Sequence, residues 1–142
     1  MRKLDEKDKE ILKILKDNSR IPFTKIAEKI DMSEATVRNR IAKLEEEGII
    51  ERYTIDIDPY KMGYNTVTLL GLDVEPEYFL KTMELLKEIE EIRWVAQSTG
   101  DHMIMAEIWT KNGRALSELM SNKIGKIEGV KRLCPSILLN KG

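Results

Sequence analysis

The stretch SEATVRNRIAKLEEEGII, from Ser33 to Ile50, combines many hydrogen-bond donors with a regular apolar stripe. Val37, Ile41 and Leu44 recur at the i, i+4, i+7 spacing that places side chains on one buried helix face. The polar side chains then lie on the flanks and the outer face, at Ser33, Glu34, Thr36, Arg38, Asn39, Arg40 and Lys43. In the DNA major groove, Asn can bond adenine, Arg can bond guanine and Thr can contact the thymine methyl group. The stretch therefore predicts a helix that reads base pairs, and the alternative is a solvated face with pairs such as Arg38 with Glu34.

The residues around this helix predict a winged helix-turn-helix domain. Asp5 is expected to cap a first helix, and Thr24 is expected to cap a short second helix that a tight connector joins to the third. Ser33 is the expected cap of the third helix, and Gly48 its end. Residues 49–58 alternate apolar and polar side chains, which predicts a half-buried strand or wing. Backbone N–H groups at the Thr24 and Ser33 caps are then placed to bind phosphate, while side chains of the third helix enter the groove.

The second half of the chain predicts a ferredoxin-like βαββαβ domain, so the fold class is α+β with two domains. Pro135 places the last strand at a sheet edge, because proline cannot donate to a central ladder. The two helices cover one face of the sheet, and we expect a second copy of the chain to cover the other. The expected strands are 66–74, 92–99, 102–110 and 130–139, the helices are 76–90 and 113–124, and Gly100-Asp101 is a tight hairpin turn. The predicted organisation is a DNA-binding domain at 1–58, a hinge at 59–65 and a dimerisation domain at 66–142.

The charge balance is nearly neutral, with 24 Lys and Arg against 25 Asp and Glu, so attraction to DNA has to come from local clusters. Cys134 is the only cysteine, which excludes an intrachain disulfide. No apolar run approaches the roughly 18 residues of a membrane span, and no secretory leader opens the chain. We therefore expect a cytoplasmic protein with no membrane partner, no cofactor and no metal. His102 is the only histidine, and a hydrogen-bonding surface role is favoured over a pH switch or a metal ligand.

Four stretches together resemble the Lrp/AsnC family of transcription regulators, the leucine-responsive or feast/famine group. In the first half they are LDEKDKEILKILKDNSR and TKIAEKIDMSEATVRNRIAKLEEEGII, and in the second half they are TGDHMIM and SNKIGKIEGV. The resemblance covers Leu4 to Leu139. It implies a homodimer joined through the ferredoxin-like halves, with tetramers and octamers as further assemblies. It also implies binding to imperfect palindromes in double-stranded DNA and control by a small effector, with an amino acid as one candidate.

Members of this family bind their effector beside the hairpin that is here Thr99-Gly100-Asp101-His102-Met103. In many of them the motif runs Gly, any residue, aromatic, Asp. Gly100 fits, whereas His102 replaces the aromatic residue and Met103 replaces the Asp that would pair with an α-amino group. An amino acid, a larger or less polar effector, and no effector at all therefore stay open. The resemblance assigns effector contacts to Thr99, Gly100, Asp101 and Met103.

Two other classes of protein are alternatives. Some proteins that resemble this family in both domains decarboxylate tetrapyrroles with His and Arg side chains of the second domain. This chain has a single histidine and no cluster of cations there, which favours a regulator without catalytic residues over an enzyme. The second alternative is a ligand-sensing scaffold that binds proteins in place of DNA. The sequence leaves open the operator, the target genes and whether transcription rises or falls.

Overall fold

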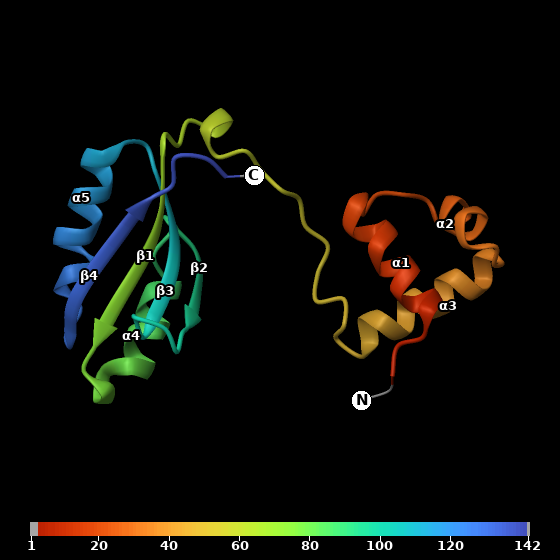
Figure 1. The fold of residues 1–142 in the computed structure, drawn as a ribbon, viewed down its shortest axis with the longest axis horizontal. Helices are drawn as coiled ribbons and strands as arrows, with labels where there is room; N and C mark the ends of the chain where they lie inside the picture. The colour runs from red at the N-terminus through yellow and green to blue at the C-terminus, as the bar shows by residue number, and fades with distance from the viewer. Residues whose placement is uncertain (1–2, 142) are drawn as a thin grey trace. The chain divides into compact units, whose positions relative to one another are not determined.

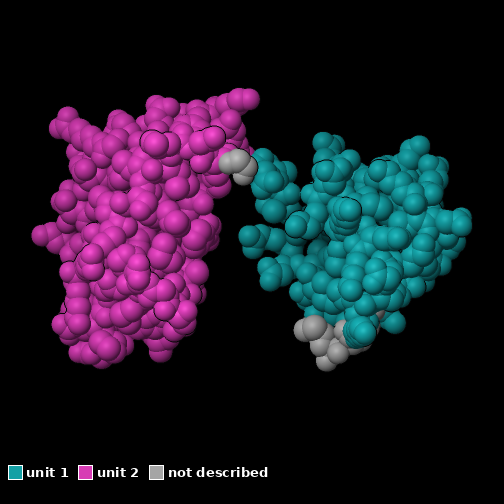
Figure 2. All heavy atoms as spheres, in the orientation of Figure 1, with its two compact units in different colours: residues 1–56 teal, residues 57–142 magenta. Residues whose placement is uncertain are grey.

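The computed structural model describes residues 3–141, so the outermost residues of the two predicted domains, 1–2 and 142, lie outside the described part. The chain divides into two compact units, residues 1–56 and residues 57–142 (Figure 1 and Figure 2). Each unit encloses its own cluster of buried apolar side chains. None of the described helices is long and apolar enough to cross a membrane.

Unit 1 contains three helices, α1 (Glu6–Asp17), α2 (Phe23–Ile30) and α3 (Glu34–Glu46). Its core joins one apolar face of each helix, because Ile11 of α1, Ile26 of α2 and the predicted stripe of α3 are all buried. The predicted cap of α1 is confirmed, since the Asp5 carboxylate accepts the Asp8 N–H at 2.8 Å. The Asp8 side chain in turn accepts the Asp5 N–H, which completes a capping box.

The start of α2 differs from the prediction. The helix begins at Phe23 after Pro22, and Thr24 lies inside its first turn with no side-chain cap bond. Pro22 has a φ of −66° and a ψ of 148°, a conformation that leads directly into a helix without a side-chain cap. Phe23 then packs against the core of unit 1, which favours starting the helix one residue before Thr24.

The predicted strand at 49–58 is wrong for the chain described. After α3, Gly48 adopts a φ of 75°, and the Ile49 N–H donates to the Leu44 carbonyl at 2.9 Å, as in a Schellman ending. Residues 51–58 are then irregular and belong to no sheet. Their alternating apolar side chains are exposed, by 73% at Ile55 and 43% at Ile57. A strand needs the ladder hydrogen bonds of a partner, and no described segment pairs with this one.

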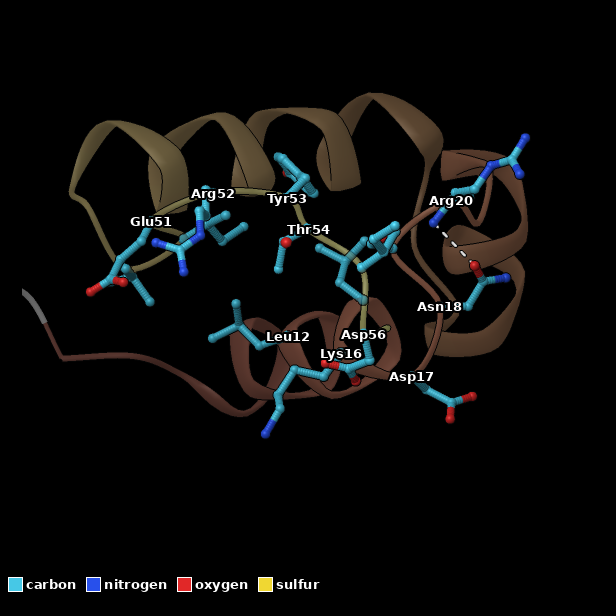
Figure 3. A pocket seen from close by; sticks show the side chains of 15 residues that line it. Leu12, Lys16, Asp17, Asn18, Arg20, Glu51, Arg52, Tyr53, Thr54 and Asp56 are labelled. Atoms are coloured by element: carbon cyan, nitrogen blue, oxygen red, sulfur yellow. Dashed lines mark hydrogen bonds between the residues drawn. The ribbon is translucent and has the colours of Figure 1, made fainter. Parts of the chain in front are cut away.

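A groove of about 770 Å³ separates this segment from the second half of α1 (Figure 3). Leu12 and Leu15 of α1 form one wall, and Ile49, Ile50 and Ile55 contribute apolar side chains to the other. Residues of the α1–α2 connection complete the rim, where the Arg20 N–H donates to the Asn18 side chain at 3.1 Å. None of the residues predicted to contact DNA lines this groove.

Unit 2 has the predicted ferredoxin-like topology. Its four antiparallel strands run in the spatial order β2-β3-β1-β4, and α4 and α5 lie on one face (Figure 1). Pro135 lies opposite Leu70 in the edge strand β4, as predicted. The strands are β1 (Thr66–Val74), β2 (Ile92–Gln97), β3 (Ile104–Thr110) and β4 (Val130–Ile137). The helices are α4 (Phe79–Lys87) and α5 (Gly113–Asn122), and short 3₁₀ turns occupy Tyr60–Met62, Pro76–Tyr78 and Ile124–Lys126.

The core of unit 2 lies between the sheet and its two helices. Leu70 of β1 and Ile108 of β3 are fully buried against Leu86 of α4 and Leu116 of α5. Burial of each such side chain contributes about 1.5–3 kcal/mol relative to exposure. The opposite face of the sheet carries alternate residues of the same strands and has no helix over it among the described residues.

The connection between β2 and β3 is longer than the predicted two-residue turn. Residues 98–103 form a loop that is closed by the Ser98 N–H donating to the Met103 carbonyl at 2.9 Å. Contacts with Asp73 of β1 explain why β2 and β3 stop pairing before the predicted turn. The Asp73 carboxylate accepts the Met103 N–H at 3.0 Å and lies 3.1 Å from His102 Nδ1. The returning end of the loop is therefore bound to β1 before it joins β3.

The segment assigned to a hinge, 59–65, forms a compact turn beside the sheet. Gly63 adopts a φ of 93° at the end of the 3₁₀ turn, where a side chain would strain the backbone. The Tyr60 hydroxyl donates to the Leu138 carbonyl at 3.2 Å, and the Asn65 N–H donates to the Lys111 carbonyl at 3.2 Å. These bonds attach the turn to unit 2.

Two buried threonines of the sheet provide a matched test of the core. The Thr68 hydroxyl is fully buried with no hydrogen-bond partner among the described residues, whereas the buried Thr110 hydroxyl donates to the Asn112 carbonyl at 3.2 Å. We expect Thr68→Val to raise the free energy of unfolding by about 1 kcal/mol, because it removes an unpaired buried hydroxyl. Thr110→Val should lower it by a similar amount, and denaturant titration of both variants measures the difference. A loss of stability in Thr68→Val would contradict this account of the core.

Candidate nucleic-acid interface

The turn between α2 and α3 brings the two helices into a helix-turn-helix. Asp31 ends α2 in the left-handed conformation with a φ of 54°, a region that Asp tolerates better than most residues. The Met32 N–H donates to the Ala27 carbonyl at 3.1 Å. Ser33 then caps α3 as predicted, with its hydroxyl accepting the Thr36 N–H at 3.1 Å. The turn thus consists of Asp31, Met32 and Ser33.

The face of α3 opposite the core is polar and mostly exposed. Ser33, Glu34, Arg38, Asn39 and Lys43 are exposed, and Thr36 is half-buried with its hydroxyl 2.7 Å from that of Ser33. Within residues 3–141, the side chains of Asn39 and Lys43 make no hydrogen bond or ion pair. These two side chains are therefore the donors most directly available to a ligand.

Arg38 takes part in the local pair that the sequence analysis offered as the alternative. Its guanidinium bonds to the Glu34 carboxylate one turn earlier, and it lies over the Phe23 ring at 6.0 Å. The two side chains of the pair are 55% and 44% exposed. Exposed pairs of this kind contribute less than about 1 kcal/mol, so Arg38 can exchange Glu34 for an anionic ligand at little cost.

Arg40 lies differently, because its guanidinium points back to α1. Its Nη1 atom is 2.7 and 2.6 Å from the two Asp5 carboxylate oxygens and 3.1 Å from Asp8 Oδ1. The Arg40 side chain is 27% exposed and that of Asp8 is fully buried. The hydrogen bond to Asp5 raises the pKa of Arg40 above its ordinary value, so the guanidinium stays charged. From the sequence, Asp5 was predicted only as the cap of α1, and its contact with Arg40 was not identified.

Thr24 lies exposed in the first turn of α2. Its hydroxyl does not cap the helix. The predicted phosphate contact therefore depends on its backbone N–H group in the first turn alone.

The residues assigned to an effector lie in the loop 98–103 of unit 2. Thr99, Gly100 and Asp101 are exposed, whereas Met103 is half-buried against the core. His102 is hydrogen-bonded, as predicted, although it is only 19% exposed.

The His102 ring lies against Gly71, where an added Cβ would come within 2.3 Å of a ring carbon. The bond to His102 and that from the Met103 N–H hold the pKa of Asp73 below its ordinary value. A side chain at position 71 would therefore displace the ring from Asp73.

A second polar cluster on the helix-free face of the sheet was not identified from the sequence. The Glu107 carboxylate accepts hydrogen bonds from Trp109 Nε1 at 2.7 Å, Trp94 Nε1 at 3.3 Å and Lys141 Nζ at 2.9 Å. The Arg93 guanidinium lies 4.2 Å from the centre of the Trp109 ring. The alternation of Met105, Glu107 and Trp109 is the signal that places Glu107 on this face. No group of His, Cys, Asp and Glu among residues 3–141 is arranged to hold a metal ion.

A helix-turn-helix with an exposed polar third helix, followed by a ferredoxin-like domain, defines a two-domain DNA-binding regulator. Residues 4–51 match the winged helix-turn-helix DNA-binding family, and residues 68–141 match the Lrp/AsnC ligand binding domain. The chain belongs to the Lrp/AsnC family of transcription regulators. The family and fold predicted from the sequence are thereby confirmed, and the class is a regulator and not an enzyme.

Curated relatives match nearly the whole chain. It is 53% identical to the HTH-type transcriptional regulator LrpA of Pyrococcus horikoshii, over 97% of this chain and 98% of that one. It is 34% identical to LrpA1 of Halobacterium salinarum, over 92% of each chain. Among solved structures, Escherichia coli AsnC shares the fold with a TM-score of 0.89 and 24% identity, over 99% of this chain and 95% of that one.

The hydrogen bonds of Glu107 predict how the free energy of unfolding changes as the pH falls. Burial raises the pKa of Glu107, but hydrogen bonds from Lys141 and Trp109 outweigh it and leave the pKa below its ordinary value of 4.5. A carboxylate with a lowered pKa stabilises the fold above its ordinary pKa and loses this contribution as pH falls through the lowered value. Glu107→Gln should therefore be less stable than the unmodified chain by about 1–2 kcal/mol at pH 7, and the difference should shrink below pH 4.5.

Denaturant titrations between pH 7 and pH 3 measure this difference. The exposed Glu118, which pairs with Arg114 on the same helix, supplies the control variant Glu118→Gln with little effect at either pH. A stability difference for Glu107→Gln that stays constant over this range would contradict the assignment of a charged Glu107.

Proposed function

We propose that the chain binds imperfect palindromes in double-stranded DNA as a homodimer, with one α3 helix in each half-site. The observation that carries the proposal is the exposed polar face of α3, placed immediately after a helix-turn-helix turn. A major groove admits one such helix, and residues near its N-terminal end and on its outer face reach the bases. A two-fold dimer requires half-sites about 34 Å apart, one turn of the duplex.

The contacts divide by chemistry into two groups. Asn39 and Arg38 carry donors suited to adenine and guanine edges, and Thr36 presents a methyl group to thymine. Lys43 and the backbone N–H groups at Ser33 and Thr24 suit phosphates, which supply most of the affinity. Glu34 either stays paired with Arg38 or accepts from a cytosine amino group when Arg38 turns to DNA.

The helix-free face of the sheet is the proposed dimer surface. Trp94, which lies opposite Glu107 on this face, is 44% exposed, and Leu139 beyond the end of β4 is 96% exposed. Exposed apolar groups of this extent favour cover by a second copy, and a symmetric pair also supplies the second α3 that a palindrome requires. Tetramers and octamers remain further assemblies of the same dimer.

A small effector and a cytoplasmic location complete the proposal. The family description of unit 2 as a ligand binding domain supports an effector, and the loop 98–103 is the proposed contact through Thr99, Gly100, Asp101 and Met103. Asp73 is already engaged by His102 and Met103, so it is a poor partner for an α-amino group. We therefore favour a less polar effector over a free amino acid. Selection of genomic DNA fragments with and without a panel of amino acids tests DNA binding and effector together.

The base-reading role of α3 is tested on a selected DNA site, with affinities compared at fixed salt and the salt slope measured over a salt series. We expect Asn39→Ala to weaken specific binding by about 1–3 kcal/mol, because it removes a base contact and leaves non-specific binding unchanged. Lys43→Ala should weaken binding to all sequences and reduce the salt slope by about 1. Lys13→Ala removes the same charge from an exposed position of α1 and serves as the control. Equal affinities for the unmodified chain and Asn39→Ala would show that another element reads the bases.

The dimer surface is tested by sedimentation. Ala96 lies on the helix-free face opposite Met105, so Ala96→Glu should place an unpaired charge in the interface and shift the chain toward monomer. Leu80→Glu makes a comparable change at a position of α4 that is 77% exposed, and it should remain dimeric. A monomeric unmodified chain at micromolar concentration would refute the proposed dimer.

A further inference from the structure

We propose that Arg40 does not contact DNA but holds the recognition helix in position, through a clasp with Asp5 and Asp8 at the start of α1. The inference rests on the proposed DNA-reading role of α3. We call these three residues the α1 clasp. Arg40 was a predicted base contact, and the clasp changes its role from reading DNA to orienting the neighbouring side chains that do so.

The geometry of the clasp joins two helices that are far apart in the sequence. One nitrogen of Arg40, Nη1, lies within 3.1 Å of oxygens from both Asp5 and Asp8. Arg40 directly precedes the buried Ile41, so its flank of α3 lies next to the core. The carboxylates belong to the capping box that begins α1. The position of α3 is therefore tied to the end of α1 that is most fixed by local hydrogen bonds.

The burial of Asp8 makes this arrangement difficult to open. Its side chain is fully buried, and taking a cationic partner away from a buried carboxylate destabilises the fold. If Arg40 turned outward to a guanine, the charge on Asp8 would lose that partner, whereas Arg38 would leave behind only an exposed Glu34. The two arginines of α3 thus differ in the free energy needed to break their ion pairs, and that of Arg38 is the smaller.

A second contact from the same turn of α1 reaches the other side of the helix-turn-helix. Lys7 Nζ donates to the Ile30 carbonyl at 2.7 Å, at the last residue of α2 before the turn. A cation is favourable there because the end of a helix carries partial negative charge. The first turn of α1 therefore holds α2 through Lys7 and α3 through Asp5 and Asp8. This supports a role for that turn in setting how α3 presents Asn39 and Lys43.

The test uses two substitutions whose effects on DNA binding should agree only if the clasp positions α3. Asp5→Asn removes the negative charge but keeps a side chain that caps helices well, and Arg40→Gln removes the cation. We expect each to weaken binding to the selected site by roughly tenfold, with little change in non-specific binding or in the salt slope. The double variant should be no weaker than Arg40→Gln alone, because both changes break the same contact. Fluorescence anisotropy over a salt series, with thermal unfolding on the same samples, gives these values.

Whether Asp5→Asn weakens or strengthens DNA binding is the decisive result. Removing a negative charge from a DNA-binding domain strengthens binding through electrostatics alone, so weaker binding identifies a positioning role. Asp17→Asn makes the same change at the exposed end of α1 and should leave specific binding unchanged or slightly stronger. If Arg40→Gln does not fold, Asp5→Asn decides the question, since it retains the cap.

The inference is overturned if Arg40→Gln reduces the salt slope by about 1 while Asp5→Asn leaves affinity equal or higher, because Arg40 then contacts phosphate. It is also overturned if neither variant changes specific binding. Failure of the proposed function has a separate signature, in which the unmodified chain prefers no DNA sequence and Asn39→Ala has no effect. That result would remove the inference together with the function on which it rests.

Discussion

A fully buried carboxylate, that of Asp8, is the constraint on which the DNA-binding unit depends. A charge in that position has to be paired, and Arg40 is the cation that reaches it from α3. The same carboxylate completes the capping box of α1, so one side chain serves the start of one helix and the placement of another. The apolar stripe of α3 is common to many helices, whereas this pairing selects one orientation of the helix on its core.

Three cations of α3 therefore have three different surroundings. Arg38 has an exposed partner on its own helix, Arg40 has a buried partner on another helix, and Lys43 has none among the described residues. All three side chains carry the same charge, but Lys43 is the most available to an anionic ligand, Arg38 is next and Arg40 is the least available. The same logic extends to unit 2, where Asp73 and Glu107 are both carboxylates whose hydrogen bonds are already filled by neighbouring side chains or backbone.

Local patterns predicted most of the fold and the exposed polar face of α3. The stripe of Val37, Ile41 and Leu44 and the Ser33 cap depend on spacing and on one side chain, so the sequence carries them directly. The edge position of Pro135 follows from its missing N–H group in the same way. Contacts between distant elements could not be obtained from such patterns, because Asp5 and Arg40 are joined only when α1 packs on α3. The strand at 49–58 was overpredicted for a related reason, since alternation signals a strand but cannot supply a partner for it.

The unpaired stretch at 51–58 contains the boundary between the two units, which falls after residue 56. Its eight residues belong to no sheet, and an extended chain of that length spans at most about 26–29 Å. In the proposed dimer, residues 51–58 would connect each helix-turn-helix to the sheet of its own chain. Under the proposed dimer, the local concentration of the second α3 near its half-site would therefore depend on the length of this stretch.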